Sequence, residues 1–200
     1  FYGIDTYGNP EANLLKSGKD IDLEFNGELR DFQKPIVNAY LKHAKTKGSG
    51  LLELYCGAGK TVLGLNIISK LKKKTLIVVH KEFLVRQWIE RIEQFLPKAR
   101  VGKIQASVID IEDKDIVIGM LQSLSMKEYD QSIFNEFGFA IFDESHHLAP
   151  EVFSRAMFKI VTPYALGLSA TMKRKDGLTK VIKMFLGEVV YKMEREKEDN

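Results

Sequence analysis

Short apolar runs alternate with longer amphipathic stretches along most of the chain. The runs at 51–55, 76–80, 116–120 and 137–142 consist mostly of Leu, Ile, Val, Phe and other apolar residues. Continuous runs of this length are typical of parallel strands that are buried on both faces. Between the first two, Thr61 to Leu71 carries apolar residues at helical spacing. The alternation predicts one α/β domain, with a mostly parallel central sheet and helices on both faces.

The two ends of the chain differ from this pattern. Residues 1–26 contain turn-forming glycines and one proline, and they predict an irregular lead-in. Within it, the alternation from Ile21 to Phe25 favours an added edge strand. Residues 187–191 (GEVVY) resemble a last strand, and the charged residues 192–200 suit a linker. We therefore expect the folded domain to comprise residues 27–191.

Composition narrows the class of protein. A chain of 200 residues with 44% hydrophobic content is long enough for one substantial core. Its 30 basic and 27 acidic residues give a net charge of +3, which is too small to indicate nucleic-acid binding by itself. One cysteine allows no internal disulfide, and no apolar run approaches the length of a membrane span. We expect an intracellular protein in a reducing compartment that does not insert into a membrane.

The sequence CGAGKT, residues 56–61, has the residue types of a phosphate-binding loop. Small residues at Cys56, Gly57, Ala58 and Gly59 allow the backbone N–H groups to surround phosphate oxygens, and the following helix directs its positive end to the same point. Lys60 would then reach the terminal phosphates and Thr61 would bind Mg²⁺. The apolar run before the loop and the helical pattern after it give the strand, loop and helix that such a site requires.

Two carboxylates, Asp143 and Glu144, follow the apolar run that ends at Phe142. Ligands of parallel sheets bind at the carboxyl ends of the strands, so these side chains are candidates for Mg²⁺ binding and for orienting or deprotonating an attacking water. The alternative is a simple helix cap, since Asp commonly occupies that position. Lys60 and Asp143 are separated by 83 positions along the chain, which leaves room for intervening strand and helix units and favours the catalytic interpretation.

His146 and His147 do not predict a metal site. Adjacent histidines do not face a common point on a helix, and the single cysteine lies in the phosphate loop. No structural zinc is expected.

Six motifs in order give the chain a family resemblance. They are LRDFQ at 29–33, YCGAGKT at 55–61, LIVVHKEFLVRQW at 76–88, IVIGMLQSL at 116–124, DESHH at 143–147 and LGLSATMKRKDG at 166–177. Over residues 29–191 the chain resembles the first RecA-like lobe of superfamily-2 DExH helicases. It is most similar to the XPB-like branch, which includes proteins of phages and large DNA viruses.

The resemblance implies roles for individual residues. Gln33 would recognise adenine and Arg30 would pack beside the base, as a side-chain amide and a planar guanidinium can do. Ser169 and Thr171 would link the nucleotide site, through His146, to the nucleic-acid site. Taken alone, the Ser-Ala-Thr sequence is also compatible with a turn of small residues.

For nucleic acid, the resemblance points to the loops after two strands, with the candidate residues Lys81, Arg86, Gln87, Gln122 and Ser123. Lys173 and Arg174, after the Ser-Ala-Thr motif, are candidates for the same surface or for contact with a second lobe. Each cation also has a simpler interpretation as a solvated surface side chain. Trp88 could stack on a base, but its spacing with neighbouring apolar residues favours the buried face of a helix.

The resemblance implies ATP and Mg²⁺ as cofactors, and DNA as the partner, with RNA still possible. It also implies a second RecA-like lobe after residue 191, which would supply arginine fingers, so the lobe alone should hydrolyse ATP slowly. A motor subunit of a restriction-type nuclease and a scaffold without turnover are the alternatives. The sequence gives no indication of oligomeric state.

Overall fold

An eight-stranded sheet forms the centre of the computed structural model, which describes residues 17–144, 149–170 and 177–195. The strand order is β4-β3-β5-β2-β6-β7-β1-β8. All neighbours are parallel except β3 and β4, which form an antiparallel pair at one edge. The strands are β1 (Ser49–Leu54), β2 (Thr75–Val79), β3 (Val101–Gln105), β4 (Val108–Asp110), β5 (Ile116–Met120), β6 (Phe139–Asp143), β7 (Tyr164–Ser169) and β8 (Val189–Met193).

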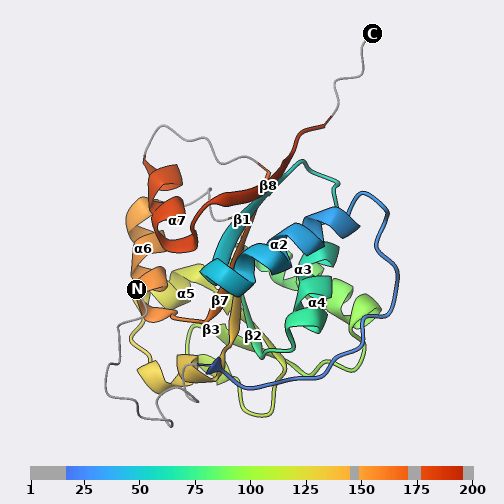
Figure 1. Ribbon diagram of the computed structural model, residues 1–200. Coiled ribbons are helices and arrows are strands. Elements are labelled where there is room, and N and C mark those ends of the chain that lie inside the picture. Colours follow the sequence, from blue (N-terminus) through green and yellow to red (C-terminus); the bar gives the residue numbers. More distant parts are fainter. Residues whose placement is uncertain (1–16, 145–148, 171–176, 196–200) are drawn as a thin grey trace.

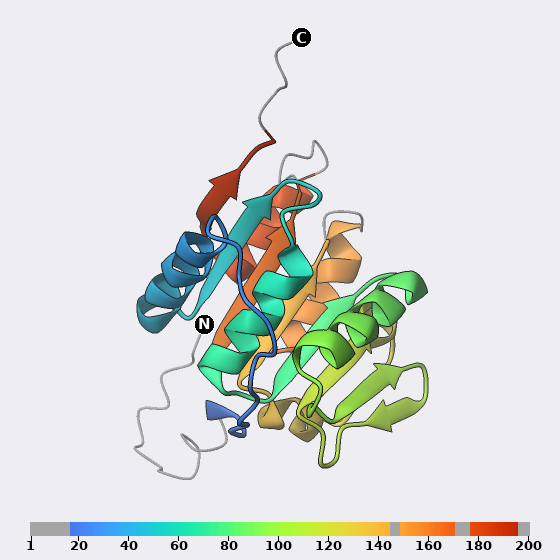
Figure 2. The same cartoon turned by 90° about the vertical axis from the view of Figure 1, so that its right-hand side faces the viewer.

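Helices cover both faces of the sheet (Figure 1). One face carries α2 (Lys34–Lys47), α3 (Lys60–Leu71) and α4 (Glu82–Phe95), as Figure 2 shows from the side. The other carries α5 (Leu121–Met126), α6 (Pro150–Lys159) and α7 (Leu178–Leu186). A 3-10 helix, η1 (Gln131–Glu136), leads into β6. This three-layer arrangement confirms the predicted fold class.

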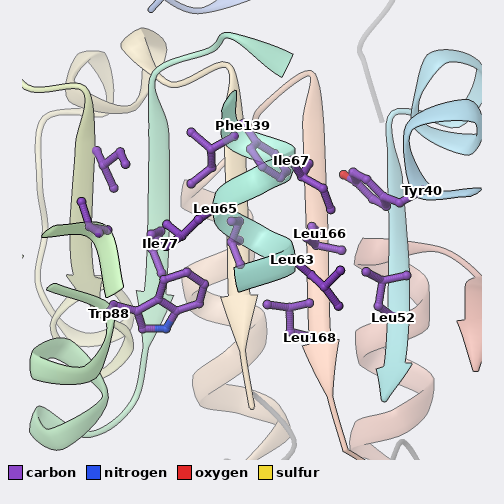
Figure 3. Packing of buried hydrophobic residues seen from close by; sticks show 14 of the residues in the cluster. Tyr40, Leu52, Leu63, Leu65, Ile67, Ile77, Trp88, Phe139, Leu166 and Leu168 are labelled. Atoms are coloured by element: carbon purple, nitrogen blue, oxygen red, sulfur yellow. The ribbon is translucent and has the colours of Figure 1, made fainter. Parts of the chain in front are cut away.

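Two hydrophobic clusters, one on each face, hold the layers together. The first packs α2, α3 and α4 on the sheet, and Figure 3 shows Trp88 of α4 beside Ile77 of β2 and Leu65 of α3. Trp88 is fully buried, which confirms its interpretation as a core residue. The second cluster lies beneath α5, α6 and α7 and includes Phe142 and Phe153, whose rings meet edge to face. The central strands are buried on both faces, and this explains their continuous apolar runs.

The lead-in does not form the predicted edge strand. Its described part, residues 17–26, makes one isolated antiparallel bridge, between Asp20 and Lys73, and then crosses the α3–α4 face without strand pairing. Leu23 is buried in the first core cluster, and the Phe25 ring stacks on that of Phe95 in α4 at 5.4 Å. The alternating apolar side chains therefore pack against helices, and β8 occupies the sheet edge next to β1.

The charged ends of two elements also differ from expectation. Lysine side chains are usually solvated on the surface, but Lys74, in the lysine-rich stretch 70–74 at the end of α3, is 2% exposed. Its ammonium lies 2.6 Å from Glu136 Oε2 and donates to the backbone carbonyl of Ile111. At the other end of the chain, β8 continues to Met193, and Lys192 pairs with Glu194 at 2.7 Å. Two residues of the predicted linker therefore belong to the sheet.

Candidate functional site

The loop between β1 and α3 has the geometry expected of a phosphate-binding loop. Gly57 and Gly59 take backbone φ angles of +99° and +81°, in the region that favours glycine. The Ala58 N–H donates to the Tyr55 carbonyl at 3.1 Å, and this bond closes the turn. Gly59 then caps α3, whose first residue is Lys60. The loop therefore presents the N-terminus of a twelve-residue helix at the carboxyl end of β1.

Sheet order brings the two predicted carboxylates to this loop. Only β7 separates β1 from β6, and its last residue, Ser169, is the register partner of Glu53 in β1. On its other side, Leu168 is the register partner of Asp143, and the Glu144 N–H donates to the Leu168 carbonyl at 2.9 Å. The buried Ser169 therefore lies between the loop and the two acids.

Lys60 and Glu144 form a direct ion pair. The Lys60 Nζ lies 2.9 Å from Glu144 Oε1, and both side chains are largely shielded from solvent. Glu144 adopts a left-handed backbone conformation with φ +52°, which is uncommon for a residue with a side chain. The two side chains predicted to act on the terminal phosphate therefore face the same point.

Asp143 is a buried acid near the loop, and its pKa is raised. It is 6% exposed, and its Oδ2 accepts a hydrogen bond of 2.9 Å from the Trp88 indole N–H. Burial raises the pKa of Asp143 from 3.8 to about 6, and the negative charge of Glu144 adds to this, while the Trp88 hydrogen bond and Lys60 act in the opposite direction. A buried carboxylate with a raised pKa in a cleft is typical of a functional site.

A cavity of about 710 Å³ opens over these residues. Its inner end is lined by the phosphate loop, Lys60, Thr61, Asp143 and Glu144. α4 contributes Phe83, Arg91 and Phe95 to the lining, and the segment before α2 contributes Glu28 and Arg30. The volume and the mixture of aromatic, cationic and acidic side chains suit a nucleotide-sized ligand.

Gln33 and Arg30, predicted to recognise a base, both line this cavity. The Gln33 amide is buried, and it donates to the Ala58 carbonyl at 2.9 Å and accepts from the Arg30 N–H at 2.9 Å. A Cβ atom added at Gly59 would lie 2.5 Å from Gln33 Nε2. In this structure Gln33 therefore supports the phosphate loop.

The predicted nucleic-acid residues fall into two groups. Lys81 caps α4, and Arg86 is exposed on the same helix. Gln122 and Ser123 lie in the first turn of α5, which directly follows β5, and not in a loop. Gln122 donates to the His80 carbonyl at 2.8 Å, so the start of α5 lies beside the residue that follows β2, and Ser123 Oγ accepts from the Ala106 N–H. Gln87, by contrast, lines the cavity beside the phosphate loop, where the sequence had not placed it.

Four predicted residues lie outside the part of the chain that the structure describes. They are His146, Thr171, Lys173 and Arg174.

Three contributions to the site were missed by sequence reasoning. Trp88 was identified as a core residue, but its hydrogen bond to Asp143 was not predicted. Arg91 and Phe95 also line the cavity, and their i+3 and i+7 spacing from Trp88 on α4 was the signal available. Glu28 carried no pattern that sets it apart from a surface acid.

Among the described residues, no helix is both long and apolar enough to cross a membrane. The same residues contain no group of three or more His, Cys, Asp or Glu side chains arranged to hold a metal ion. Cys56 is an exposed free thiol in the phosphate loop.

Fold and site together define a nucleoside-triphosphatase domain of the P-loop class, with a RecA-like sheet. The family described as "Type III restriction enzyme, res subunit" matches residues 26–174. The chain belongs to this family.

Relatives of the chain are named as helicases and translocases. One is a "Putative ATP-dependent RNA helicase" of Acanthamoeba polyphaga mimivirus, which is 35% identical over 193 residues, or 96% of this chain and 37% of that protein. Another is the "DNA 3'-5' translocase XPB2" of Sulfurisphaera tokodaii, which is 36% identical and covers 82% of this chain and 36% of that protein. The chain thus spans little more than a third of the length of these two relatives.

Solved structures with the same fold are helicase cores. The UvsW helicase of bacteriophage T4 matches 90% of this chain and 66% of its own chain, with a TM-score of 0.66 at 21% identity. The SWI2/SNF2 ATPase core of Sulfolobus solfataricus, solved in complex with double-stranded DNA, matches 86% of this chain and 38% of its own, also with a TM-score of 0.66. These likenesses confirm a RecA-like fold.

Proposed function

We propose that the chain is the ATP-binding lobe of a motor that couples ATP hydrolysis to movement along DNA or to its unwinding. The observation that carries the proposal is the convergence of Lys60, Asp143 and Glu144 on one cavity at the phosphate loop. Lys60 would contact the terminal phosphates, and Glu144 would orient or deprotonate the attacking water. The names of the helicase and translocase relatives support the same function.

The oxygen ligands of this site fit Mg²⁺. A hydroxyl from Thr61 and a carboxylate from Asp143 are hard ligands, and both residues line the cavity. The Trp88 indole N–H donates a hydrogen bond to one Asp143 oxygen, and the other oxygen has no hydrogen-bond partner among the described residues. When bound, Mg²⁺ would neutralise charge on the triphosphate, and Asp143 would hold it directly or through water. The high pKa of Asp143 fits a carboxylate that gains a cation on ligand binding.

The proposed nucleic-acid surface consists of the neighbouring starts of α4 and α5, with Lys81, Arg86, Gln122 and Ser123. Contacts from such helix starts to phosphates fix position without reading sequence. Lys173 and Arg174 are proposed for the same surface, and His146, Ser169 and Thr171 for the link between the two sites. DNA is the proposed partner because one relative is named a DNA translocase, while another is named an RNA helicase, so RNA is the competing substrate.

The proposal includes a second RecA-like lobe in the same polypeptide, reached through residues 192–200. The greater length of the relatives supports this arrangement. Arginine fingers from such a lobe increase phosphoryl-transfer rates by about 10³ to 10⁵ where they have been measured. Residues 1–200 alone should therefore bind nucleotide weakly and hydrolyse it slowly. A reducing intracellular compartment is proposed for the protein, in keeping with a phosphate loop that contains the free thiol of Cys56.

A second candidate function is the motor subunit of a restriction-type nuclease. The printed description of the family favours it, because that description names the res subunit of type III restriction enzymes. A nuclease domain in the same protein or complex would distinguish it from a helicase. A scaffold without turnover is the weaker alternative, since a scaffold has no chemical need for Lys60, Asp143 and Glu144 together.

The decisive experiment measures phosphate release by the chain joined to its second lobe. Single-stranded, duplex and branched DNA and RNA are each added, and a Glu144→Gln variant is measured in parallel. Stimulation by DNA that the variant abolishes is expected. Equal turnover in the variant would contradict the role of Glu144, and no stimulation by any of the four nucleic acids would refute the motor function.

A further inference from the structure

Trp88, the only tryptophan in the chain, donates its indole N–H to one catalytic-site carboxylate. The bond to Asp143 Oδ2 is 2.9 Å long and lies in the interior, with Trp88 fully buried and Asp143 6% exposed. The indole has a single donor and no acceptor, so this bond uses its whole hydrogen-bonding capacity. The proposed Mg²⁺ carboxylate is thus oriented by a side chain from another element.

Close packing fixes the position of the ring. A Cβ atom added at Gly64 of α3 would lie 3.1 Å from the outer edge of the indole, so the glycine provides the space that the ring fills. On the sheet side the ring lies beside Ile77, as Figure 3 shows. Neighbouring side chains in such a core leave little freedom for a large ring to change rotamer. A shift of α4 would therefore move the indole with it.

The same helix begins at the proposed nucleic-acid surface. Lys81 caps α4, and Trp88 follows two turns later, a rise of about 10 Å. The Gln122 amide, at the start of α5, donates a 2.8 Å hydrogen bond to the carbonyl of His80, the residue before Lys81. One rigid element thus has proposed strand contacts at its first turn and the Asp143 hydrogen bond at its second.

A purely structural explanation would require only some acceptor for a buried indole. The same core shows how that need can be met by backbone, since the buried Tyr40 hydroxyl donates to the Ala165 carbonyl at 2.7 Å. Trp88 donates instead to a buried carboxylate, which is a costly group to enclose. That choice of acceptor indicates a role at the site.

We propose that Trp88 is a positioning residue that holds the Asp143 carboxylate for Mg²⁺ and transmits strand contact at the start of α4 to the nucleotide site. The inference rests on the proposed function for its second half, because transmission requires a nucleic-acid surface. Its first half concerns only the nucleotide site. The two halves therefore need separate tests.

The first test compares Trp88→Phe with Tyr40→Phe in the 200-residue chain. Each change removes one buried hydrogen bond from the same core, but only the first removes a partner of Asp143. Binding of a fluorescent, non-hydrolysable ATP analogue is titrated at increasing Mg²⁺ concentrations. Loss of a side chain that orients a metal ligand typically weakens metal affinity by about 10- to 100-fold, and we expect Trp88→Phe to raise the Mg²⁺ requirement within that range. Tyr40→Phe should leave it unchanged within about twofold, the ordinary context-dependence of such effects.

Two further measurements separate positioning from a general loss of structure. In an Asp143→Asn background, Trp88→Phe should have little additional effect on the Mg²⁺ requirement, because the indole acts through that carboxylate. In the unaltered chain, the emission of the single tryptophan should change when Mg²⁺ and the analogue bind together, and this readout needs no variant. An unchanged Mg²⁺ requirement in Trp88→Phe, an equal loss in Tyr40→Phe, or constant emission would each overturn the first half.

The second test measures transmission in the chain joined to its second lobe. Anisotropy of a labelled DNA strand reports strand binding, and the affinity for the Mg²⁺–analogue complex is measured with and without the strand. We expect DNA to change that affinity in the unaltered protein and to lose this effect in Trp88→Phe, which should still bind DNA. Retention of the effect in the variant would overturn transmission through Trp88. Absence of strand binding by the unaltered protein would instead refute the proposed function, and transmission with it, while the Mg²⁺ result would stand.

Discussion

Replacing Asp143 with Asn should stabilise the folded chain at neutral pH while it removes a residue that the proposed activity requires. Burial holds the pKa of Asp143 at about 6, against 3.8 for an unperturbed side chain. This difference corresponds to about 3 kcal/mol of destabilisation when the group is ionised, at about 1.4 kcal/mol for each tenfold change in the acid dissociation constant. An amide is nearly isosteric, and its carbonyl oxygen can accept the Trp88 hydrogen bond. The variant therefore avoids the cost of the buried charge.

The sign of the pH dependence follows from the direction of the pKa change. Because the folded pKa is higher than the unfolded one, the folded state binds more protons between pH 3.8 and about 6, and its stability falls as the pH rises through that window. Above the window the full cost is present. The advantage of Asp143→Asn in the free energy of unfolding should accordingly be about 3 kcal/mol at pH 8, roughly half of that at pH 5 and below about 1 kcal/mol at pH 4.

Urea denaturation followed by circular dichroism at these three pH values measures the difference directly. Asp31→Asn is the matched control, since the Asp31 side chain is fully exposed and its pairing with Lys34 spans only three residues. The control should differ from the unaltered chain by less than about 0.5 kcal/mol at every pH, as surface substitutions usually do. Equal stability of Asp143→Asn and the unaltered chain at pH 8, or a difference that does not shrink toward pH 4, would refute the assignment of a buried, destabilised carboxylate.

Two other substitutions test the supports of the site. Gly59→Ala places a Cβ atom 2.5 Å from Gln33 Nε2 at a φ of +81°, so we expect the free energy of unfolding to fall by about 1–3 kcal/mol and an ATP analogue to bind more weakly. Urea denaturation measures the first effect and fluorescence titration the second. Unchanged values of both would contradict the geometry of the loop. Glu136→Gln removes the ionic partner of the buried Lys74 and should destabilise the chain by about 2 kcal/mol, which is less than the 3–5 kcal/mol of a fully buried pair because Glu136 is partly exposed. Urea denaturation measures the change, and Glu128→Gln, at an exposed ion pair, is the control. Equal effects of the two substitutions would contradict a role for burial.

The central strands could be predicted because burial on both faces determines their sequence pattern. A strand covered by helices on both faces has no polar face, and the runs at 76–80 and 116–120 correspond to β2 and β5 within one residue. The alternation at 21–25 led to a wrong prediction because it arises from packing on helices. There the apolar side chains pack on α3 and α4, so alternation marks contact with helices and not membership of a sheet.

Charged residues were harder to predict than apolar ones. Lys74 stands in a run of lysines, and nothing local distinguishes it from the exposed Lys70 and Lys72. Its burial depends on Glu136 and the Ile111 carbonyl, which lie 62 and 37 positions away along the chain. The hydrogen bond from Trp88 to Asp143 likewise depends on residues that are distant in sequence, because it requires β2 and β6 to be neighbours in the sheet. Periodicity gives the buried face of α4 but not the acceptor that this face meets.

The ion pair between Lys60 and Glu144 connects the separate roles predicted for these two residues. Sequence motifs assigned the lysine to phosphate and the acid to water, yet in this structure each neutralises the other at 2.9 Å. The left-handed backbone at Glu144, held by its N–H bond to the Leu168 carbonyl, gives the two consecutive acids different partners, Trp88 for Asp143 and Lys60 for Glu144. Under the proposed function, a triphosphate, which carries more negative charge than one carboxylate, would draw Lys60 away from Glu144. The same exchange of partners would then bind the nucleotide and leave a carboxylate beside its terminal phosphate, where water must be activated.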